Sequence, residues 1–105
     1  MSTAESPVAN ICRYRVKPGR AEEFLGHLKR HWPVLHKAGL STSEPARIWQ
    51  CQDKAGNIAF VEHFAWKGQD SSRAAHQSPA VMALWEPMGA LCDDMEFWQA
   101  TPVTP

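Results

Sequence analysis

Residues 58–66, IAFVEHFAW, decide the fold class of this chain. The segment is rich in aromatic and β-branched residues, and the turn sequence DKAGN links it to the alternating segment ARIWQCQ at 46–52, so the two predict a β-hairpin. Apolar residues occupy both sets of alternate positions in 58–66, for example Phe60 on one side and Val61 on the other. A sheet with one face in water shows polar residues at every second position. We therefore expect both faces of this strand to be covered.

Before the hairpin, the sequence predicts one strand and one helix. The strand covers residues 8–17, VANICRYRVK, and a Pro-Gly step ends it. The helix covers residues 20–39, where apolar residues recur at helical spacing. Pro33 within it predicts a kink, because proline lacks the backbone N–H of the helical ladder.

After the hairpin, two helical segments and a strand are predicted. Asp70 predicts the cap of a short helical turn that runs through His76. Ser78 followed by Pro79 predicts the start of a longer helix, since a hydroxyl caps the first turn and proline fits the first helical position. The last predicted strand covers residues 95–103, MEFWQATPV.

The resulting order, β-α-β-β-α-β, predicts an α+β ferredoxin-like fold. In this fold a four-stranded antiparallel sheet carries two helices on one face. Residues 1–105 are expected to form a single domain with a core over 8–100, a short flexible N-terminus and a proline-broken C-terminal tail. The sheet face that the helices leave uncovered is expected to pack on a second copy of the chain, giving a homodimer.

The composition excludes several classes of protein. Eleven Lys and Arg residues balance 11 Asp and Glu residues, and no basic stripe is present, so nucleic-acid binding is not expected. No apolar run reaches the ~20 residues of a membrane span, and the first ten residues do not resemble a secretion signal. The cysteines Cys12, Cys51 and Cys92 are widely spaced and odd in number, which predicts reduced thiols in the cytoplasm.

Two segments carry a resemblance to a known family. YRVKPGRAEEF at 14–24 and VEHFAWKGQDSSRAAHQSPAVMAL at 61–84 resemble the antibiotic-biosynthesis-monooxygenase-like domains of the dimeric α+β barrel superfamily. The resemblance covers about residues 8–100. It implies a dimeric α+β barrel, in a superfamily that includes cofactor-free quinol and polyketide monooxygenases as well as haem-degrading enzymes.

The haem-degrading branch is disfavoured residue by residue. The resemblance implies an Asn in the first strand of those enzymes and a Trp and a His in the later helical segment. These places fall on Cys12, Ala75 and Trp85 of this chain, so none of the three residue types is retained.

His31 and His76 are candidate proton-transfer residues. His31 falls between Leu28 and Leu35 on the apolar stripe of the first helix, where it is either a hydrogen-bonded core residue or a base that lines a pocket. His76 stands just before the Ser78 cap, either as the end of a short helix or at the mouth of that pocket. His27 lies four residues before His31, a spacing that two metal ligands can use, but no third ligand is apparent and no metal site is predicted.

Glu62 is the third catalytic candidate. It lies in the middle of an aromatic strand, with His63 on the opposite face, and the sequence does not decide which of the two points inward. A desolvated glutamate would serve as a base. A salt bridge to Arg13 or Arg15 of a partner sheet would explain Glu62 equally well.

Three aromatic residues are expected to contact substrate, namely Trp85, Tyr14 and Trp32. Each has an alternative role as core packing, with the Tyr14 hydroxyl reaching the edge of the sheet. We predict a cofactor-independent monooxygenase for a small aromatic, quinol or polyketide-like substrate, with an apolar pocket between sheet and helices and no cofactor. The alternative is a non-catalytic small-ligand-binding or stress-related protein of the same fold.

Overall fold

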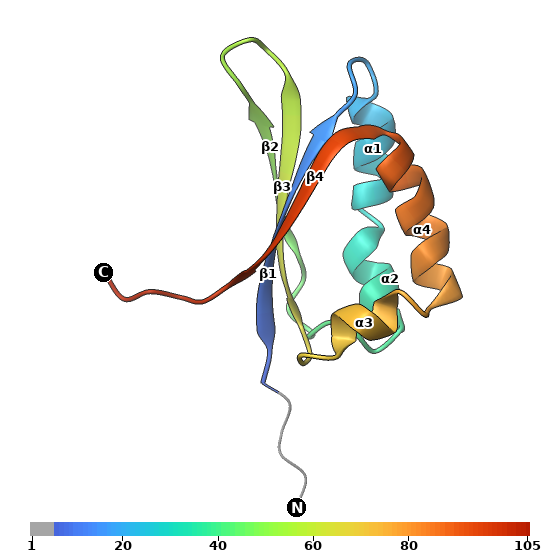
Figure 1. Cartoon of the computed structure of the whole chain (residues 1–105), viewed down its shortest axis with the longest axis vertical. Helices are drawn as coiled ribbons and strands as arrows, with labels where there is room; N and C mark the ends of the chain where they lie inside the picture. The colour runs from blue at the N-terminus through green and yellow to red at the C-terminus, as the bar shows by residue number, and fades with distance from the viewer. Residues whose placement is uncertain (1–5) are drawn as a thin grey trace, which may run out of the picture.

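A computed structural model describes residues 6–105 and shows one sheet with all helices on one side of it (Figure 1). The predicted flexible N-terminus falls largely on residues 1–5, outside the described residues. The elements in chain order are β1 (Val8–Val16), α1 (Ala21–Leu28), α2 (His31–Lys37), β2 (Arg47–Gln52), β3 (Ile58–Trp66), α3 (Ser71–Ala75), α4 (Pro79–Ala90) and β4 (Cys92–Ala100). The four-stranded sheet has the order β2-β3-β1-β4, and every pair is antiparallel. The predicted α+β ferredoxin-like fold and the hairpin are confirmed.

The two central strands supply the sheet side of the core. Every second residue of β1 from Val8 to Val16 is buried, and so is every second residue of β3 from Phe60 to Trp66. In the β1–β3 register Cys12 is opposite Glu62, which places both side chains on the inner, helix-covered face. Strand alternation therefore brings a carboxyl group into the core.

The helix predicted over residues 20–39 is divided in two. α1 ends at Leu28, Lys29 and Arg30 form a turn, and α2 starts at His31. Pro33 explains the division, because it has no N–H to donate to the Lys29 carbonyl and its ring clashes with that group. In α2, Pro33 occupies the first turn, where no intrahelical donor is needed.

The segment that joins β3 to α4 confirms one predicted cap and corrects the other. The Ser78 hydroxyl accepts a hydrogen bond from the Val81 N–H at 3.4 Å, as expected for the cap of α4. Asp70 stands at the cap position of α3, but its side chain makes no capping bond. Its carboxylate pairs with the Arg73 guanidinium instead.

The last strand starts earlier than predicted and ends earlier. β4 runs from Cys92 to Ala100, whereas the sequence predicted residues 95–103. Its first residues are polar and show no apolar alternation, yet their backbone pairs with β1, where Cys92 is opposite Val16. Beyond Ala100 the chain leaves the body of the molecule as an extended tail (Figure 1).

The outer face of the sheet lies away from the helices. Apolar side chains form cross-strand pairs on it: Trp49 is opposite Val61, and Ile11 is opposite Trp98. Arg13 pairs with Asp94 at 2.7 Å and with Glu96 across β1 and β4. Trp49 and Trp98 are 49% and 47% exposed, respectively. Between residues 6 and 105, no helix is long and apolar enough to cross a membrane.

Candidate functional site

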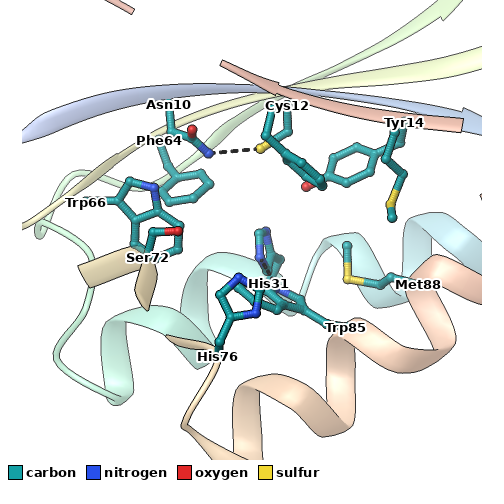
Figure 2. A pocket seen from close by; sticks show the side chains of 12 residues that line it. Asn10, Cys12, Tyr14, His31, Phe64, Trp66, Ser72, His76, Trp85 and Met88 are labelled. Carbon is teal, nitrogen blue, oxygen red and sulfur yellow. Dashed lines mark hydrogen bonds between the residues drawn. The ribbon is translucent and has the colours of Figure 1, made fainter. Parts of the chain in front are cut away.

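A cavity of about 270 Å³ lies between the inner face of the sheet and the helices. Figure 2 shows β1 side chains on one side of it and helix side chains, including His31, His76 and Trp85, on the other. The lining is mostly apolar and aromatic, with a few polar groups, as is typical of small-molecule sites. The lining residues are Asn10, Cys12, Tyr14, His31, Phe64, Trp66, Ser72, His76, Trp85, Met88, Met95 and Phe97.

His31 is held on both ring nitrogens. It is buried at the start of α2, and its Nδ1 lies 2.9 and 3.0 Å from the two carboxylate oxygens of Glu62. Its Nε2 lies 2.8 Å from the Trp85 Nε1. An indole N–H can only donate, so Nε2 must be the acceptor and Nδ1 must carry the proton that is donated to Glu62. This network assigns His31 to the Nδ1–H tautomer.

Glu62 lies behind His31 and Tyr14 and does not line the cavity. Its side chain is 0% exposed, and it accepts hydrogen bonds from the Tyr14 hydroxyl at 2.8 Å and from His31 Nδ1. A buried carboxylate is tolerated only when such donors satisfy it. Since Arg13 and Arg15 lie on the outer face, the interpretation of Glu62 as an interface partner of an arginine is wrong. Glu62 can act only through the residues that it contacts.

Tyr14 and Cys12 line the same wall and remain protonated at neutral pH. Burial raises the pKa of the Tyr14 hydroxyl well above its ordinary value of 10.0, and the nearby negative charge of Glu62 adds to the effect. Burial, followed by the same charge, also raises the pKa of the Cys12 thiol. The Tyr14 hydroxyl points into the core, not to the edge of the sheet. Neither group is available as an anionic base or nucleophile.

His76 lies at the rim of the cavity. It follows the last residue of α3, is exposed, and contributes to the lining. Its ring packs edge-to-face on Trp85, with 4.9 Å between the ring centroids. Trp85 is half-buried and is therefore in contact with both histidines, a buried one and an exposed one.

The structure does not bring Trp32 to the cavity. Its indole stacks on His36 of the same helix, with 4.8 Å between the centroids and 9° between the planes. His27 does not join His31 either, because its Nδ1 contacts Arg30 Nη2 at 2.6 Å. Within residues 6–105, no group of three or more His, Cys, Asp or Glu side chains is arranged to hold a metal ion.

Asn10 is a polar lining residue that sequence reasoning missed. It is buried on β1, and its amide N–H donates to the Cys12 sulfur at 3.1 Å (Figure 2). The alternation of the strand contained the signal, because Asn10 shares the parity of Cys12 and Tyr14 and is the one polar amide on that apolar face. Ser72 on α3 was also missed, and no periodicity in its short helix points to it.

Comparison with known proteins places this geometry on a familiar fold. The sequence matches no protein-family model and no curated protein sequence. A variant of SnoaB from Streptomyces nogalater, described as a cofactor-independent oxygenase, is 18% identical over 94% of this chain and 95% of that chain, with a TM-score of 0.69.

Two further solved structures match over nearly their whole length. A Bacteroides thetaiotaomicron protein, provisionally assigned as an antibiotic biosynthesis monooxygenase, is 17% identical over 98% of this chain and 95% of that one, with a TM-score of 0.71. Rv0793 from Mycobacterium tuberculosis is 16% identical over 95% of this chain and 98% of that chain, with a TM-score of 0.69. The chain has the fold of the antibiotic-biosynthesis-monooxygenase-like proteins.

Proposed function

We propose that this protein is a cofactor-independent monooxygenase that acts on a small aromatic, quinol or polyketide-like substrate in the cavity beside His31. The observation that carries the proposal is that His31, which lines an apolar cavity, is hydrogen-bonded to the buried Glu62 carboxylate behind it. The description of SnoaB as a cofactor-independent oxygenase supports the same class of reaction. Such chemistry requires a positioned base and an apolar site that accepts both an aromatic molecule and dioxygen.

The first step is removal of a proton by His31. The Nε2 lone pair receives the proton of a substrate hydroxyl, and the ring becomes an imidazolium. Glu62, which accepts the Nδ1–H at 2.9 Å, stabilises that positive charge. Tyr14 donates to the same carboxylate and holds it in place. A general base of this kind contributes about 10²–10⁴-fold to a rate.

The resulting anion reacts with dioxygen without further help. For a phenol with a free para position, the phenolate transfers one electron to dioxygen, and the radical pair combines to form a bond between the para carbon and one oxygen atom. The peroxide takes the proton back from His31. Loss of water, which contains the outer oxygen and the hydrogen of the para carbon, leaves a quinone. One phenol and one dioxygen thus give one quinone and one water, a four-electron oxidation.

His76 is proposed as the second proton-transfer residue. It is exposed at the rim and touches the cavity, so it can exchange protons between the site and bulk water. Its loss should lower turnover less than the loss of His31, because water reaches the same position.

A binding protein without catalysis is the second candidate function. It is favoured by the mostly apolar lining and by the engagement of both His31 nitrogens within the protein. In that case the cavity would hold a small apolar or aromatic ligand, and His31 would serve only as a polar contact.

We further propose a homodimer formed through the outer sheet face. Trp49, Val61, Ile11 and Trp98 form paired apolar positions on it. Arg13 lies in the same face, and its buried Nη1 has no hydrogen-bond partner within residues 6–105. A second copy would cover the apolar side chains and supply an acceptor, as expected for an interface of about 2,000 Å².

The thiols support a proposed location in the cytoplasm. Cys51 is exposed and unpaired, and Cys12 and Cys92 are free as well. Exposed free thiols suit a reducing compartment, where they are not converted to disulfides.

Oxygen consumption tests the proposed function. Wild type and the variants His31→Ala, Glu62→Gln and His76→Ala would be assayed with a panel of phenols, naphthols and anthrones. We expect His31→Ala to lower kcat/KM by at least about 100-fold and Glu62→Gln by at least about tenfold. His36→Ala is the matched control, since His36 is an exposed histidine of the same helix outside the cavity.

The product distinguishes the candidates further. The proposed reaction transfers one atom of labelled dioxygen to the organic product and releases no hydrogen peroxide. Binding of the phenols without any oxygen uptake by wild type would favour the binding-protein alternative. Turnover that survives His31→Ala would show that His31 is not the base.

A further inference from the structure

The Trp85 indole N–H is hydrogen-bonded to Nε2 of His31, the nitrogen that acts as the base in the proposed reaction. Nε2 of His31 has a single lone pair, and the Trp85 N–H already donates to it at 2.8 Å. We infer that the Trp85 N–H blocks the Nε2 lone pair of His31. Only a ligand with a hydroxyl able to donate to Nε2 then displaces the indole and forms a hydrogen bond with His31. This inference rests on the proposed function and assigns to Trp85 the control of access to Nε2 of His31.

The position of Trp85 is set by α4. Val81, Leu84 and Met88 bury one side of this helix, and the Ser78 cap fixes its first turn. Trp85 lies beside that buried side and lines the cavity. The indole is therefore held against His31 by a packed helix, and its ring is partly exposed at the rim.

Displacement of the indole has an energetic consequence that depends on the ligand. If an ether or a hydrocarbon separated Trp85 from His31, a donor and an acceptor would both lose their partner inside an apolar cavity, which is unfavourable. A phenolic hydroxyl restores the bond to Nε2, so that only the indole N–H must find a new partner. Only a hydroxyl donor therefore exchanges with the indole at Nε2, whereas a molecule of the same shape that cannot donate binds with the Trp85–His31 bond intact.

His76 is placed to receive the displaced indole. Its ring contacts Trp85 at 4.9 Å between centroids, on the exposed side of the cavity. Within the described part of the chain, no hydrogen bond involves the His76 ring nitrogens. An indole that turns away from His31 therefore meets water and a ring acceptor at the rim.

A titration of wild-type protein tests the inference without turnover. The five tryptophan N–H signals would be followed by ¹⁵N NMR during addition of 2-naphthol or of 2-methoxynaphthalene, which has the same ring system but no donor. The signal absent in Trp85→Phe identifies the Trp85 N–H. We expect 2-naphthol to shift this signal and to leave the His31 Nδ1 protonated, whereas the ether leaves the Trp85 signal in place.

Binding constants of a matched pair of variants complete the test. Trp85→Phe keeps an aromatic ring but removes the N–H, so 2-naphthol no longer competes for Nε2. The preference for 2-naphthol over the ether should rise about fivefold, the effect of one net hydrogen bond. Trp32→Phe changes an indole of α2 that lies outside the cavity, and it should leave the preference unchanged.

Several outcomes would overturn the inference. These are an equal shift of the Trp85 signal with both ligands, an unchanged preference in Trp85→Phe, and failure of 2-naphthol to bind at millimolar concentration. If Trp85→Phe does not fold, the wild-type titration decides by itself, with the signal assigned from its proximity to His31. If the indole is displaced but the protein consumes no oxygen with any phenol, only the monooxygenase proposal is refuted. If the protein turns over a phenol while the indole signal does not move, only the role of Trp85 is refuted.

Discussion

The two faces of the same sheet differ in how their polar side chains are hydrogen-bonded. On the inner face, the buried Glu62 carboxylate is bonded to Tyr14 and His31, and the chain of contacts continues to Trp85. On the outer face, Arg13 is paired with exposed carboxylates, and one of its guanidinium nitrogens is buried without a partner within residues 6–105. The inner network is complete within one chain, whereas the outer face is not.

This difference places the proposed chemistry on one face of the sheet and the proposed dimer contact on the other. Neighbouring residues of β3 show it most directly, since Glu62 points into the core and His63 points to the outer face. The inner position requires hydrogen-bond partners from β1 and α2. The outer position requires no such partner, because His63 is only partly buried there. We therefore expect inner-face variants to change the stability of the fold and outer-face variants to change dimer formation.

The largest effect is expected from Glu62→Ala. The substitution leaves the Tyr14 hydroxyl and the His31 Nδ1–H without their acceptor in the core. We expect the free energy of unfolding in urea to fall by about 3–5 kcal/mol, the effect of breaking a buried polar pair. Glu96→Ala on the outer face removes a partly exposed partner of Arg13 and should lower it by at most about 1 kcal/mol.

Both proteins must be compared at one concentration, because dimer formation would shift the apparent stability. Equal losses for the two variants would contradict the contrast between the faces. Glu62→Gln, which keeps an acceptor oxygen, should lose less than Glu62→Ala.

The next effect concerns assembly. Trp98 is 47% exposed on the outer face and is opposite Ile11, so Trp98→Asp places a charge in the proposed interface. We expect the dimer dissociation constant in sedimentation equilibrium to rise at least about 30-fold, as for loss of an aromatic hot spot. Met82→Asp on α4 changes an apolar residue on the helix side that is 40% exposed, and it should leave the dimer intact. A wild-type protein that is monomeric at micromolar concentration would refute the interface.

A smaller effect is a dependence of stability on pH that originates on the inner face. Burial and the Glu62 charge raise the pKa of Cys12 above its ordinary value of 9.0, so the folded state keeps the thiol protonated. The unfolded chain loses this proton above about pH 9, and the folded state does not. The contribution is therefore complete below about pH 9 and is lost as the pH rises, at up to about 1.4 kcal/mol per pH unit.

Urea unfolding between about pH 8 and pH 10 measures this slope. Cys12→Ala should reduce it. Val16→Ala, a change at a buried position of the same strand without a titratable group, should lower stability but keep the slope of the wild type. The same slope in Cys12→Ala and wild type would contradict the assignment.

The smallest effect leaves stability unchanged and compares the exposed thiol of the outer face with the two other thiols. Cys51 lies on the outer face of β2 and is exposed, while Cys12 is buried. Burial and Asp93 raise the pKa of Cys92 to about 11. At pH 8 an aromatic disulfide reagent should therefore modify Cys51 at least about tenfold faster than the other two. Loss of the fast phase in Cys51→Ser would show that Cys51 is the fast-reacting thiol. If Cys51 is labelled more slowly in wild type than in Trp98→Asp, the partner subunit covers it in the dimer.

Local periodicity predicted the elements that depend on local interactions. The hairpin of residues 46–52 and 58–66, the Ser78 cap and the inward position of His31 follow from strand alternation, turn chemistry and helical spacing. Trp32 was misplaced for a local reason as well. The buried stripe continues through the turn at Lys29 and Arg30 to His31 and Leu35, and Trp32 lies beside it, where its indole stacks on His36.

The orientation of Glu62 could not be predicted, because both parities of β3 are apolar. Either register of the strand would have buried hydrophobic residues. The partners of Glu62 decide the matter, and they lie on other elements. A carboxylate can be buried on the side where Tyr14 and His31 donate to it and cannot be buried alone.

The sequence by itself therefore determined the order of strands and helices, the aromatic character of the core and the inventory of titratable side chains. Only the tertiary structure decided which of those side chains act together. His31 is separated from Glu62 by 31 residues and from Trp85 by 54, so no local pattern connects them. Helix packing on an antiparallel sheet brings the three within hydrogen-bond distance, because each satisfies a polar group that the core would otherwise bury without a partner.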